Sequence, residues 1–314
     1  MGLTIGVDIG GTKVLGGVVD DDGAVVATTR RPTPADDVAK TRDVIIDVVR
    51  DLAQGRDIDA VGIGAAGWID ADRSTVLFAP NLAWRNEPLQ QAVSAGTGLP
   101  VVVENDANVA AWAEFRYGAA ADADDSMVLY TVGTGIGGGI ILNGRLVRGA
   151  HGIAAELGHV QVVPDGHPCG CGRRGCIEQY ASGSALVRFA QNGAKDDPGA
   201  AAVLLGKVGG DVAGITGPLV TEAAQEGDPV AIDAFRQIGT WLGVAMADMV
   251  QILDPQVIVV GGGVVETGDL LMTPTMASYN EQLAQRAKVP IGEVRPAKMG
   301  NTAGIVGAAD LARR

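Results

Sequence analysis

An adjacent asparagine and aspartate, Asn105 and Asp106, stand where a run of valines changes to a helical pattern, in the stretch ENDANVAAWAEFRYG at residues 104–118. Two roles fit Asp106. Aspartate is a common N-cap residue because its carboxylate accepts hydrogen bonds from the free N–H groups of the first helical turn. A carboxylate in a binding site can instead take a proton from a substrate hydroxyl. On this stretch alone, the cap is the favoured interpretation.

The cysteines offer a second kind of chemistry. Cys169, Cys171 and Cys176 are the three cysteines of the chain and fall within eight residues. An odd number of cysteines, with no secretory signal, argues against a disulfide framework. Three thiols on the glycine-rich, polar loop PCGCGRRGC are instead typical of a structural zinc site that has one further ligand. By sequence distance the nearest histidine is His167, and free cysteines in a core remain the alternative.

Two glycine-rich stretches, GIGAAG at 62–67 and GTGIGG at 133–138, match the dinucleotide pattern G-x-G-x-x-G. That pattern indicates dinucleotide binding only where a helix begins directly after it. Here WIDADRS, read as a loop, and GIILNGR, read as a strand, follow instead, and the Walker A pattern is absent. What remains is a pair of Gly-Thr turns between strands, whose N–H groups can converge on phosphate. We therefore expect a nucleotide in a cleft between two related halves.

The elements that must position these residues repeat one plan. Residues 3–30 predict three strands joined by tight turns, and residues 126–149 repeat that pattern with a turn at Asn143-Gly144. A helix over 35–56 is expected to cover the first sheet, and the apolar runs at 59–67 and 99–106 predict buried parallel strands. Asp228 is predicted to cap a helix over 229–253, which a strand at 255–265 and a last helix at 301–314 follow.

Composition limits the partners. The 314 residues, 47% of them hydrophobic, suffice for two modest domains with proper cores. With 24 Lys and Arg against 37 Asp and Glu, the formal charge of −13 disfavours nucleic acid as a ligand. No basic and apolar leader and no run of about 18 apolar residues is present. We expect a cytoplasmic protein that binds no membrane.

Several motifs together resemble those of the ROK (repressor and kinase) family, nearly from end to end. They are DIGGTK at 8–13, ENDAN at 104–108, GTGIGGG at 133–139, ELGH at 156–159 and CGCGRRGCIE at 169–178. The resemblance implies an α/β, two-domain, actin-like ATPase or ribonuclease H-like fold with an inter-lobe cleft. It predicts a smaller domain over 1–110, completed by a C-terminal helix at about 300–314, and a larger one over 111–299 that carries the zinc loop.

The resemblance is strongest to the sugar kinases of the family, and it implies ATP-dependent phosphorylation of glucose at the 6-hydroxyl. In such kinases the aspartate of the Asn-Asp pair is the general base, so Asp106 becomes base and cap candidate together. The implied sugar ligands are Asn105, Asp106, Glu156, His159 and Glu178. Asp8 resembles the carboxylate that orients Mg²⁺, and the implied contacts to ATP are Gly10, Gly11, Thr12, Lys13, Thr134, Gly135, Gly262 and Gly263.

The family pattern also assigns the fourth zinc ligand. It gives this role to the histidine of the E-x-G-H motif, so the predicted Zn²⁺ ligands are His159, Cys169, Cys171 and Cys176. One imidazole nitrogen could then hold Zn²⁺ while the other meets a sugar hydroxyl. A departure from the family is GAAGWID, which lacks a proline often found there. This weakens the assignment of the loop near Gly67 and Asn81 to sugar binding.

Other functions stay open at this point. A sugar-responsive repressor of the same family would carry a helix-turn-helix segment before the first strands, whereas the first strand here is expected by about Leu3. A noncatalytic sugar-binding protein would have little need for Asp8 and Asp106 beside two phosphate turns. Rival substrates are N-acetylmannosamine, mannose and fructose, and polyphosphate is a possible additional donor. A homodimer or homotetramer is expected.

Overall fold

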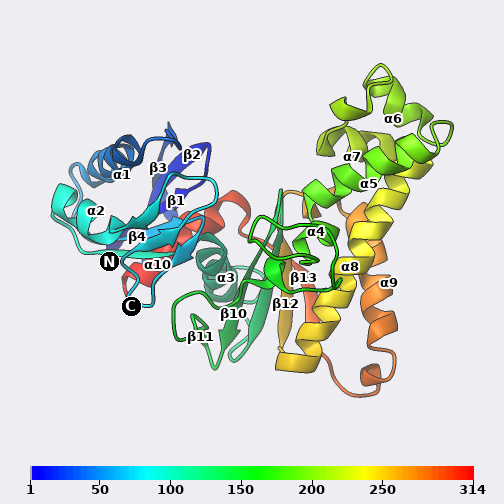
Figure 1. The fold of residues 1–314 in the computed structure, drawn as a ribbon. Helices are drawn as coiled ribbons and strands as arrows, with labels where there is room; N and C mark the ends of the chain where they lie inside the picture. Colours follow the sequence, from blue (N-terminus) through cyan, green and yellow to red (C-terminus); the bar gives the residue numbers. More distant parts are fainter. Residues whose placement is uncertain (1) are drawn as a thin grey trace. The chain divides into compact units, whose positions relative to one another are not determined.

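The computed structural model describes residues 2–314, an α/β chain whose internal packing divides it into two compact units (Figure 1). Unit 1 is the chain up to Leu129, together with Gly138–Glu156 and Ala297–Arg314. Unit 2 is Tyr130–Gly137 together with Leu157–Pro296. Within residues 2–314, no helix is both long enough and apolar enough to cross a bilayer.

Unit 1 is built on a five-stranded sheet of order β3-β2-β1-β4-β8. Strands β1, β2 and β3 form the predicted antiparallel meander, and β1, β4 and β8 are parallel, as the apolar runs indicated. The elements of this unit are β1 (Leu3–Ile9), β2 (Lys13–Val19), β3 (Val25–Pro32), α1 (Val38–Ala53), β4 (Ile58–Ala65), β5 (Trp68–Ile69), β6 (Val76–Phe78), β7 (Arg85–Glu87), α2 (Leu89–Thr97), β8 (Val101–Asn105), α3 (Asp106–Tyr117), β11 (Arg145–Leu146), η5 (Gly300–Thr302) and α10 (Ala303–Ala312).

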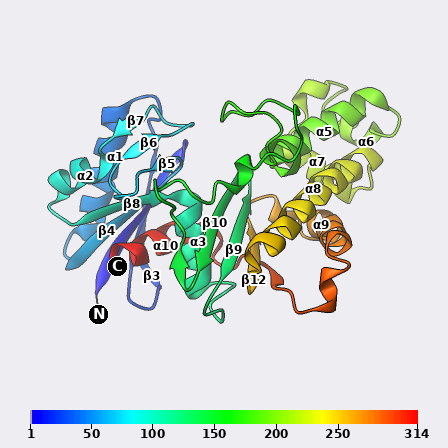
Figure 2. The same ribbon diagram turned by 60° about the horizontal axis from the view of Figure 1, so that its bottom comes forward.

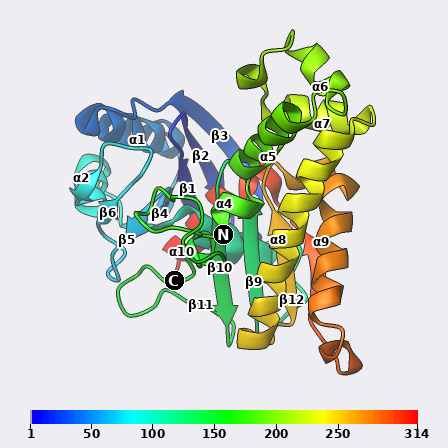
Figure 3. The same ribbon diagram turned by 45° about the vertical axis from the view of Figure 1, so that its right-hand side comes forward.

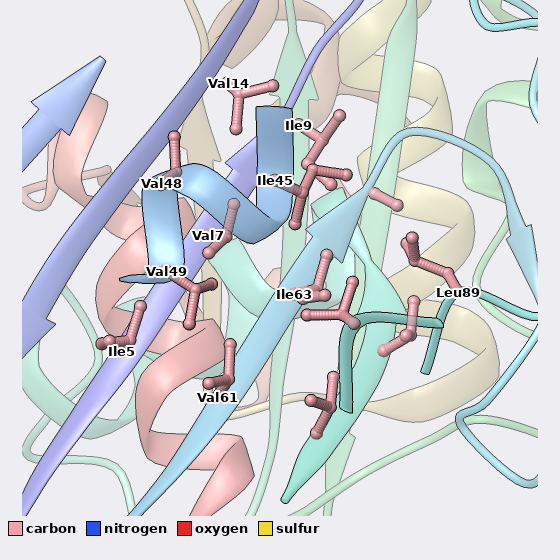
Figure 4. Packing of buried hydrophobic residues seen from close by; sticks show 14 of the residues in the cluster. Ile5, Val7, Ile9, Val14, Ile45, Val48, Val49, Val61, Ile63 and Leu89 are labelled. Carbon is pink, nitrogen blue, oxygen red and sulfur yellow. The ribbon is translucent and has the colours of Figure 1, made fainter. Parts of the chain in front are cut away.

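One face of this sheet is covered by the predicted helix, α1. Asp37 caps α1 by accepting a hydrogen bond from the Lys40 N–H, and the helix ends just before Gly55, whose φ is +70°. Alternation along β1 turns Ile5, Val7 and Ile9 to this face, where they pack with α1 side chains such as Ile45, Val48 and Val49 (Figure 4). The buried branched side chains fix the register of the strands that carry the site.

The other face of the sheet packs against α10, the predicted C-terminal helix. A Cβ atom at Gly6 of β1 would overlap the Ile305 carbonyl oxygen, and one at Gly62 of β4 would overlap that of Ala308. Glycine is therefore required at both strand positions, because only backbone without a side chain admits the helix this closely. The GIGAAG stretch serves helix packing here, and no helix opens directly after it.

Trp68 and Ile69, which the sequence placed in a loop, form the short strand β5 instead. They pair with β6 in a three-stranded sheet of order β5-β6-β7 (Figure 2). Glu87 of β7 lies 3.7 Å from Arg42 of α1. Strand β5 was not predicted because two residues are too few for an alternation of apolar and polar side chains to be recognised.

A second five-stranded sheet has the order β11-β10-β9-β12-β13, the same third-second-first-fourth-fifth plan as the first. The boundary between the units falls within β9 (Met127–Val132) and β10 (Ile136–Leu142). Asn143 and Gly144 form the predicted turn after β10 with φ of +52° and +66°. The repeated strand order confirms the duplication read from the sequence.

Helices dominate unit 2. Asp228 caps α8 through the Ala231 N–H, as predicted, and α8 runs beside α9, where the Ser278 hydroxyl donates to the Thr240 carbonyl at 2.9 Å (Figure 3). The remaining elements of this unit are η1 (Leu157–His159), α4 (Glu178–Ala181), α5 (Gly183–Asp196), α6 (Ala202–Lys207), η2 (Val212–Gly214), α7 (Gly217–Gln225), α8 (Pro229–Leu253), β12 (Val257–Gly261), η3 (Val265–Thr267), α9 (Asp269–Gln282), η4 (Arg286–Lys288) and β13 (Glu293–Pro296).

Candidate active site

The Asn105-Asp106 pair lies at the junction between β8 and α3. Asn105, not Asp106, is the N-cap: its side-chain oxygen accepts hydrogen bonds from the Ala107 and Asn108 N–H groups at 2.9 and 3.0 Å. The predicted cap role of Asp106 is therefore wrong. Asp106 is the first helical residue, and its Oδ1 accepts from the adjacent Ala107 N–H at 2.9 Å. Its carboxylate is half-buried at the positive end of the helix.

Asp8 lies at the carboxyl edge of the same parallel strands. It aligns with Gly64 of β4, which aligns with Glu104 of β8, so Asp8 and the start of α3 meet at one edge of the sheet. The alternation of β1 turns Asp8 away from α1 and toward α10. There a Cβ atom at Gly304 would come within 2.8 Å of the Asp8 carboxyl carbon. Ligands of open α/β sheets bind at such carboxyl edges.

Electrostatics link Asp8, Asp106 and Lys13. Burial, and then the charge of Asp106, raise the pKa of Asp8 to about 6, while Lys13 acts in the opposite direction. Burial also raises the pKa of Asp106, against the hydrogen bonds from backbone N–H groups. Two neighbouring carboxyl groups whose pKa values burial raises, one of them also shifted by the charge of the other, are typical of a functional site.

Asp8 gives the fold a pH dependence that can be measured. Because its pKa rises from 3.8 to about 6 on folding, the folded chain holds a proton between these pH values that the unfolded chain releases. Its contribution to the free energy of unfolding is full below pH 4 and is lost as the pH rises through 6, by about 3 kcal/mol.

We expect Asp8→Asn to be more stable than the parent at pH 7.5 and equally stable near pH 4. Urea unfolding without nucleotide or metal measures this difference, with the exposed Asp57→Asn as the control. A difference that stayed constant with pH would contradict it.

The turn from Gly10 to Lys13 is held in shape by hydrogen bonds. The Gly10 N–H donates to the Lys13 carbonyl at 3.0 Å, and the Thr33 hydroxyl donates to the Gly10 carbonyl at 2.8 Å. Asn81 lies against Gly11, where an added Cβ would come within 3.3 Å of the Asn81 Cβ. The side-chain amide of Asn105 donates to the Gly67 carbonyl at 3.0 Å. Unit 1 thus brings Asp8, the phosphate turn and the Asn-Asp pair to one region.

The second Gly-Thr turn lies in unit 2, against the start of α5. The Gly183 N–H donates to the Gly133 carbonyl at 2.8 Å, and the Ser184 hydroxyl donates to the Thr134 carbonyl at the same distance. No local pattern indicates the contact between Ser184 and Thr134, because these residues are 50 positions apart. The N-terminus of α5 thus adjoins Thr134, a backbone arrangement suited to phosphate.

Gly262 brings the end of β12 to the same turn. Its φ is +94°, and a Cβ there would lie about 2.5 Å from the Val132 carbonyl oxygen, so glycine is required twice over. The Val264 N–H donates to the same Val132 carbonyl at 3.0 Å. The structure therefore brings the predicted residues Thr134, Gly135, Gly262 and Gly263 together in unit 2.

Glu178, the first residue of α4, connects this turn to the cysteine loop. Its Oε2 accepts from the Ile136 N–H at 3.2 Å, and its Oε1 lies 3.8 Å from the Cys169 sulfur. A Cβ atom at Gly135 would overlap the Glu178 carboxylate, so a larger residue there would displace that side chain. Glu156, by contrast, is the last residue of a unit 1 segment and follows Ala155, whose φ is +65°.

The cysteine loop gathers the donor set of a metal site. Among residues 2–314, His159, Cys169, Cys171 and Cys176 have ligand atoms within 4.8 Å of one another. His159 Nδ1 lies 3.5 Å from the Cys169 sulfur, and the Cys171 and Cys176 sulfurs are 3.7 Å apart. Burial and the other two thiols raise the pKa of Cys176 to about 12, so the thiols resist ionising together unless a cation offsets their charge. The donor set and this crowding fit Zn²⁺.

His167 points elsewhere. It lies outside this cluster, and its ring packs 5.6 Å from the ring of Tyr180. The His167 N–H donates to the Tyr180 hydroxyl at 2.9 Å, which fastens the cysteine loop to α4. Sequence distance alone therefore favours a histidine that the fold uses as a packing residue.

Comparison with known proteins gives the family. The ROK family model matches residues 4–314. A glucokinase of Streptomyces coelicolor is 50% identical over 313 residues, covering 100% of this chain and 98% of the relative. An N-acetylmannosamine kinase of Yersinia pseudotuberculosis is 34% identical and covers 84% of each chain.

A solved structure agrees with these relatives. The crystal structure of a ROK family glucokinase from Streptomyces griseus, in complex with glucose and AMPPNP, is 51% identical. It covers 99% of both chains with a TM-score of 0.87. ROK sugar kinases have the actin-like ATPase two-domain fold, so the predicted fold class is confirmed. The chain belongs to the ROK family.

Proposed function

We propose that this chain transfers the γ-phosphoryl group of ATP to the 6-hydroxyl of glucose. The observation that carries the proposal is that this chain is 50% identical, over its full length, to a glucokinase. A relative that binds glucose and AMPPNP supports the same pair of substrates. The lower identity and coverage of the N-acetylmannosamine kinase favour glucose over that sugar.

Asp106 is the proposed general base. A sugar hydroxyl attacks phosphorus poorly until a base accepts its proton, and a positioned carboxylate contributes about 10²–10⁴-fold. Because Oδ1 of Asp106 accepts the Ala107 N–H, we assign proton acceptance to Oδ2. Burial makes this carboxylate a stronger base than an exposed aspartate, since it raises the pKa. Because the side-chain oxygen of Asn105 caps α3, the Asp106 carboxylate is not needed as the helix cap.

Asn105 is proposed to bind glucose through the second N–H group of its side-chain amide. Its Oδ1 accepts two N–H groups, and its Nδ2 donates once to the Gly67 carbonyl. A primary amide has two N–H donors, so the second can bind a sugar oxygen. Glu156, His159 and Glu178 are proposed to bind the other hydroxyls.

The proposed donor residues follow the two glycine turns. Asp8, Gly10, Gly11, Thr12 and Lys13 belong to unit 1, and Thr134, Gly135, Gly262 and Gly263 belong to unit 2. Mg²⁺, when bound with ATP, neutralises phosphate charge, and Asp8 is the carboxylate proposed to orient it. Lys13 and the backbone N–H groups of the turns bind phosphate oxygens.

Zn²⁺ is proposed to have a structural role, held by His159, Cys169, Cys171 and Cys176. The geometry points His159 Nδ1 toward the sulfurs, so Nε2 of the same ring is the atom proposed to meet a sugar hydroxyl. Glu178 begins α4 beside this loop, so an ordered loop would also fix that carboxylate.

A panel of hexoses tests the proposed substrate. ADP release coupled to a reporter enzyme is measured with glucose, mannose, fructose and N-acetylmannosamine at equal concentration. We expect kcat/KM to be highest for glucose. A higher kcat/KM for N-acetylmannosamine, or no ADP release with any of the four sugars, would overturn the assignment.

The predicted domain boundaries, 1–110 with 300–314 and then 111–299, stay a proposal, as does assembly into a homodimer or homotetramer. Light scattering from the purified chain in solution measures the assembly. A monomer at micromolar concentration would contradict it.

A further inference from the structure

A buried carboxylate stands directly before the Asn-Asp pair. Glu104 ends the valine run of β8, and only 2% of its surface is exposed. No step proposed above uses it. A carboxylate this buried is retained only with charged or polar partners, because burial of an unpaired charge is strongly unfavourable.

One oxygen of Glu104 serves the start of α3. Oε1 accepts from the Asn105 N–H at 3.1 Å and from the side-chain amide of Asn108 at 3.0 Å. These two bonds fix the Asn105 peptide and the first turn of the helix that carries Asp106. Asn108 is itself 1% exposed, so water does not replace the contact.

The other oxygen serves the segment that leads to Glu156. Oε2 accepts from Arg148 Nε at 2.5 Å, and Arg73 Nε lies 3.7 Å away. The Arg148 carbonyl in turn accepts the Ala154 N–H at 3.0 Å, closing the loop that ends at Glu156. All these residues belong to unit 1.

We propose that Glu104 is a positioning residue for sugar binding, which holds the Asn105-Asp106 pair through one oxygen and the Glu156 segment through the other. The inference rests on the proposed function, since it gives Glu156 and Asn105 the sugar. Arg148 is the partner that transmits the contact to residues 149–156. The carboxylate therefore sets the relative placement of two groups of proposed ligands within one unit.

The two oxygens allow a selective test. Glu104→Gln keeps one oxygen that accepts from Asn105 and Asn108 but places an NH₂ group toward Arg148. Because this NH₂ group and the Arg148 guanidinium are both donors, they cannot form a hydrogen bond. Pairing it with Arg148→Met removes one of the two cations that face this oxygen while Arg73 stays, so the double variant is expected to regain part of the thermal stability that Glu104→Gln loses. In the double variant the Asp106 side keeps its contacts while the Glu156 segment is released.

We expect the double variant to raise KM for glucose at least about tenfold while kcat stays within about threefold. Amide hydrogen exchange of residues 149–156 should be at least about tenfold faster than in the parent. The matched control is Glu114→Gln, which alters a different buried carboxylate, on α3. Glu114 accepts the Lys298 and Met299 N–H groups at the far end of the helix, so its loss should lower Tm without changing either readout.

The outcomes separate this inference from the proposed function. An active parent whose KM and exchange are unchanged in the double variant overturns the inference, because Glu104 then only stabilises the fold. A parent without activity on glucose overturns the proposed function alone. In that case unchanged exchange of residues 149–156 still overturns the positioning role, and faster exchange supports it.

Discussion

Asp106→Asn is expected to lower kcat at least about 10²-fold while KM for glucose changes little. The variant keeps the size and polarity of the side chain but removes the proton acceptor. Because Asn105 is the helix cap, α3 should form normally and Tm should not fall. Tm should instead rise at neutral pH, because the charge of Asp106 contributes to the raised pKa of Asp8. Steady-state kinetics and thermal unfolding measure both effects.

Asn105→Ala is the matched control for Asp106→Asn. It removes the cap, which costs about 1 kcal/mol of stability, and it removes one proposed sugar contact. We expect a lower Tm and a higher KM, the reverse of the Asp106→Asn pattern. Turnover of Asp106→Asn within tenfold of the parent would remove the assignment of Asp106 as base.

Cys171→Ser is expected to abolish stoichiometric zinc, lower Tm and raise KM for glucose. The loop between His159 and Glu178 is held by hydrogen bonds such as those from the Gly175 N–H to the His167 carbonyl and from the His167 N–H to the Tyr180 hydroxyl. Metal ligation is expected to add to these bonds in ordering the loop against chain entropy. Loss of that order should displace Glu178, which lies 3.8 Å from the Cys169 sulfur. Metal analysis by mass spectrometry, with Tm and KM from the same preparation, measures the effect.

His167→Ala is the control for the zinc prediction. It should retain about one zinc per chain, because His167 lies outside the cluster and packs on Tyr180. Zinc lost on His167→Ala but retained on His159→Ala would reverse the ligand choice. A parent protein free of zinc would remove the site.

Local patterns predicted the parts of the fold that local interactions determine. The two meanders, α1 and α8 follow from alternation, turn residues and caps, such as Asp228 on the Ala231 N–H. The turn at Asn143-Gly144 follows from the positive φ that both residues tolerate. Each of these signals lies within one element and its immediate flanks.

Contacts between distant segments were not predictable in the same way. Asn105 and Asp106 are both good caps, and which one caps depends on where β8 ends, at the pairing of Asn105 with Ala65. Glu104 was not singled out, since its partner Arg148 is 44 residues away. The contact of Ser184 with Thr134 has the same cause. The candidate site was predicted by motif, whereas its supporting contacts required the fold.

The reaction proposed for this chain is phosphoryl transfer to the 6-hydroxyl of glucose. It is tested most directly by incubating the purified chain with Mg²⁺ and ATP, and with either glucose or 6-deoxyglucose, and identifying the products by phosphorus and proton NMR. We expect glucose 6-phosphate from glucose and no phosphorylated sugar from 6-deoxyglucose, because Asp106 then has no 6-hydroxyl to deprotonate. A phosphate ester on any other oxygen, or phosphorylation of 6-deoxyglucose, would contradict it.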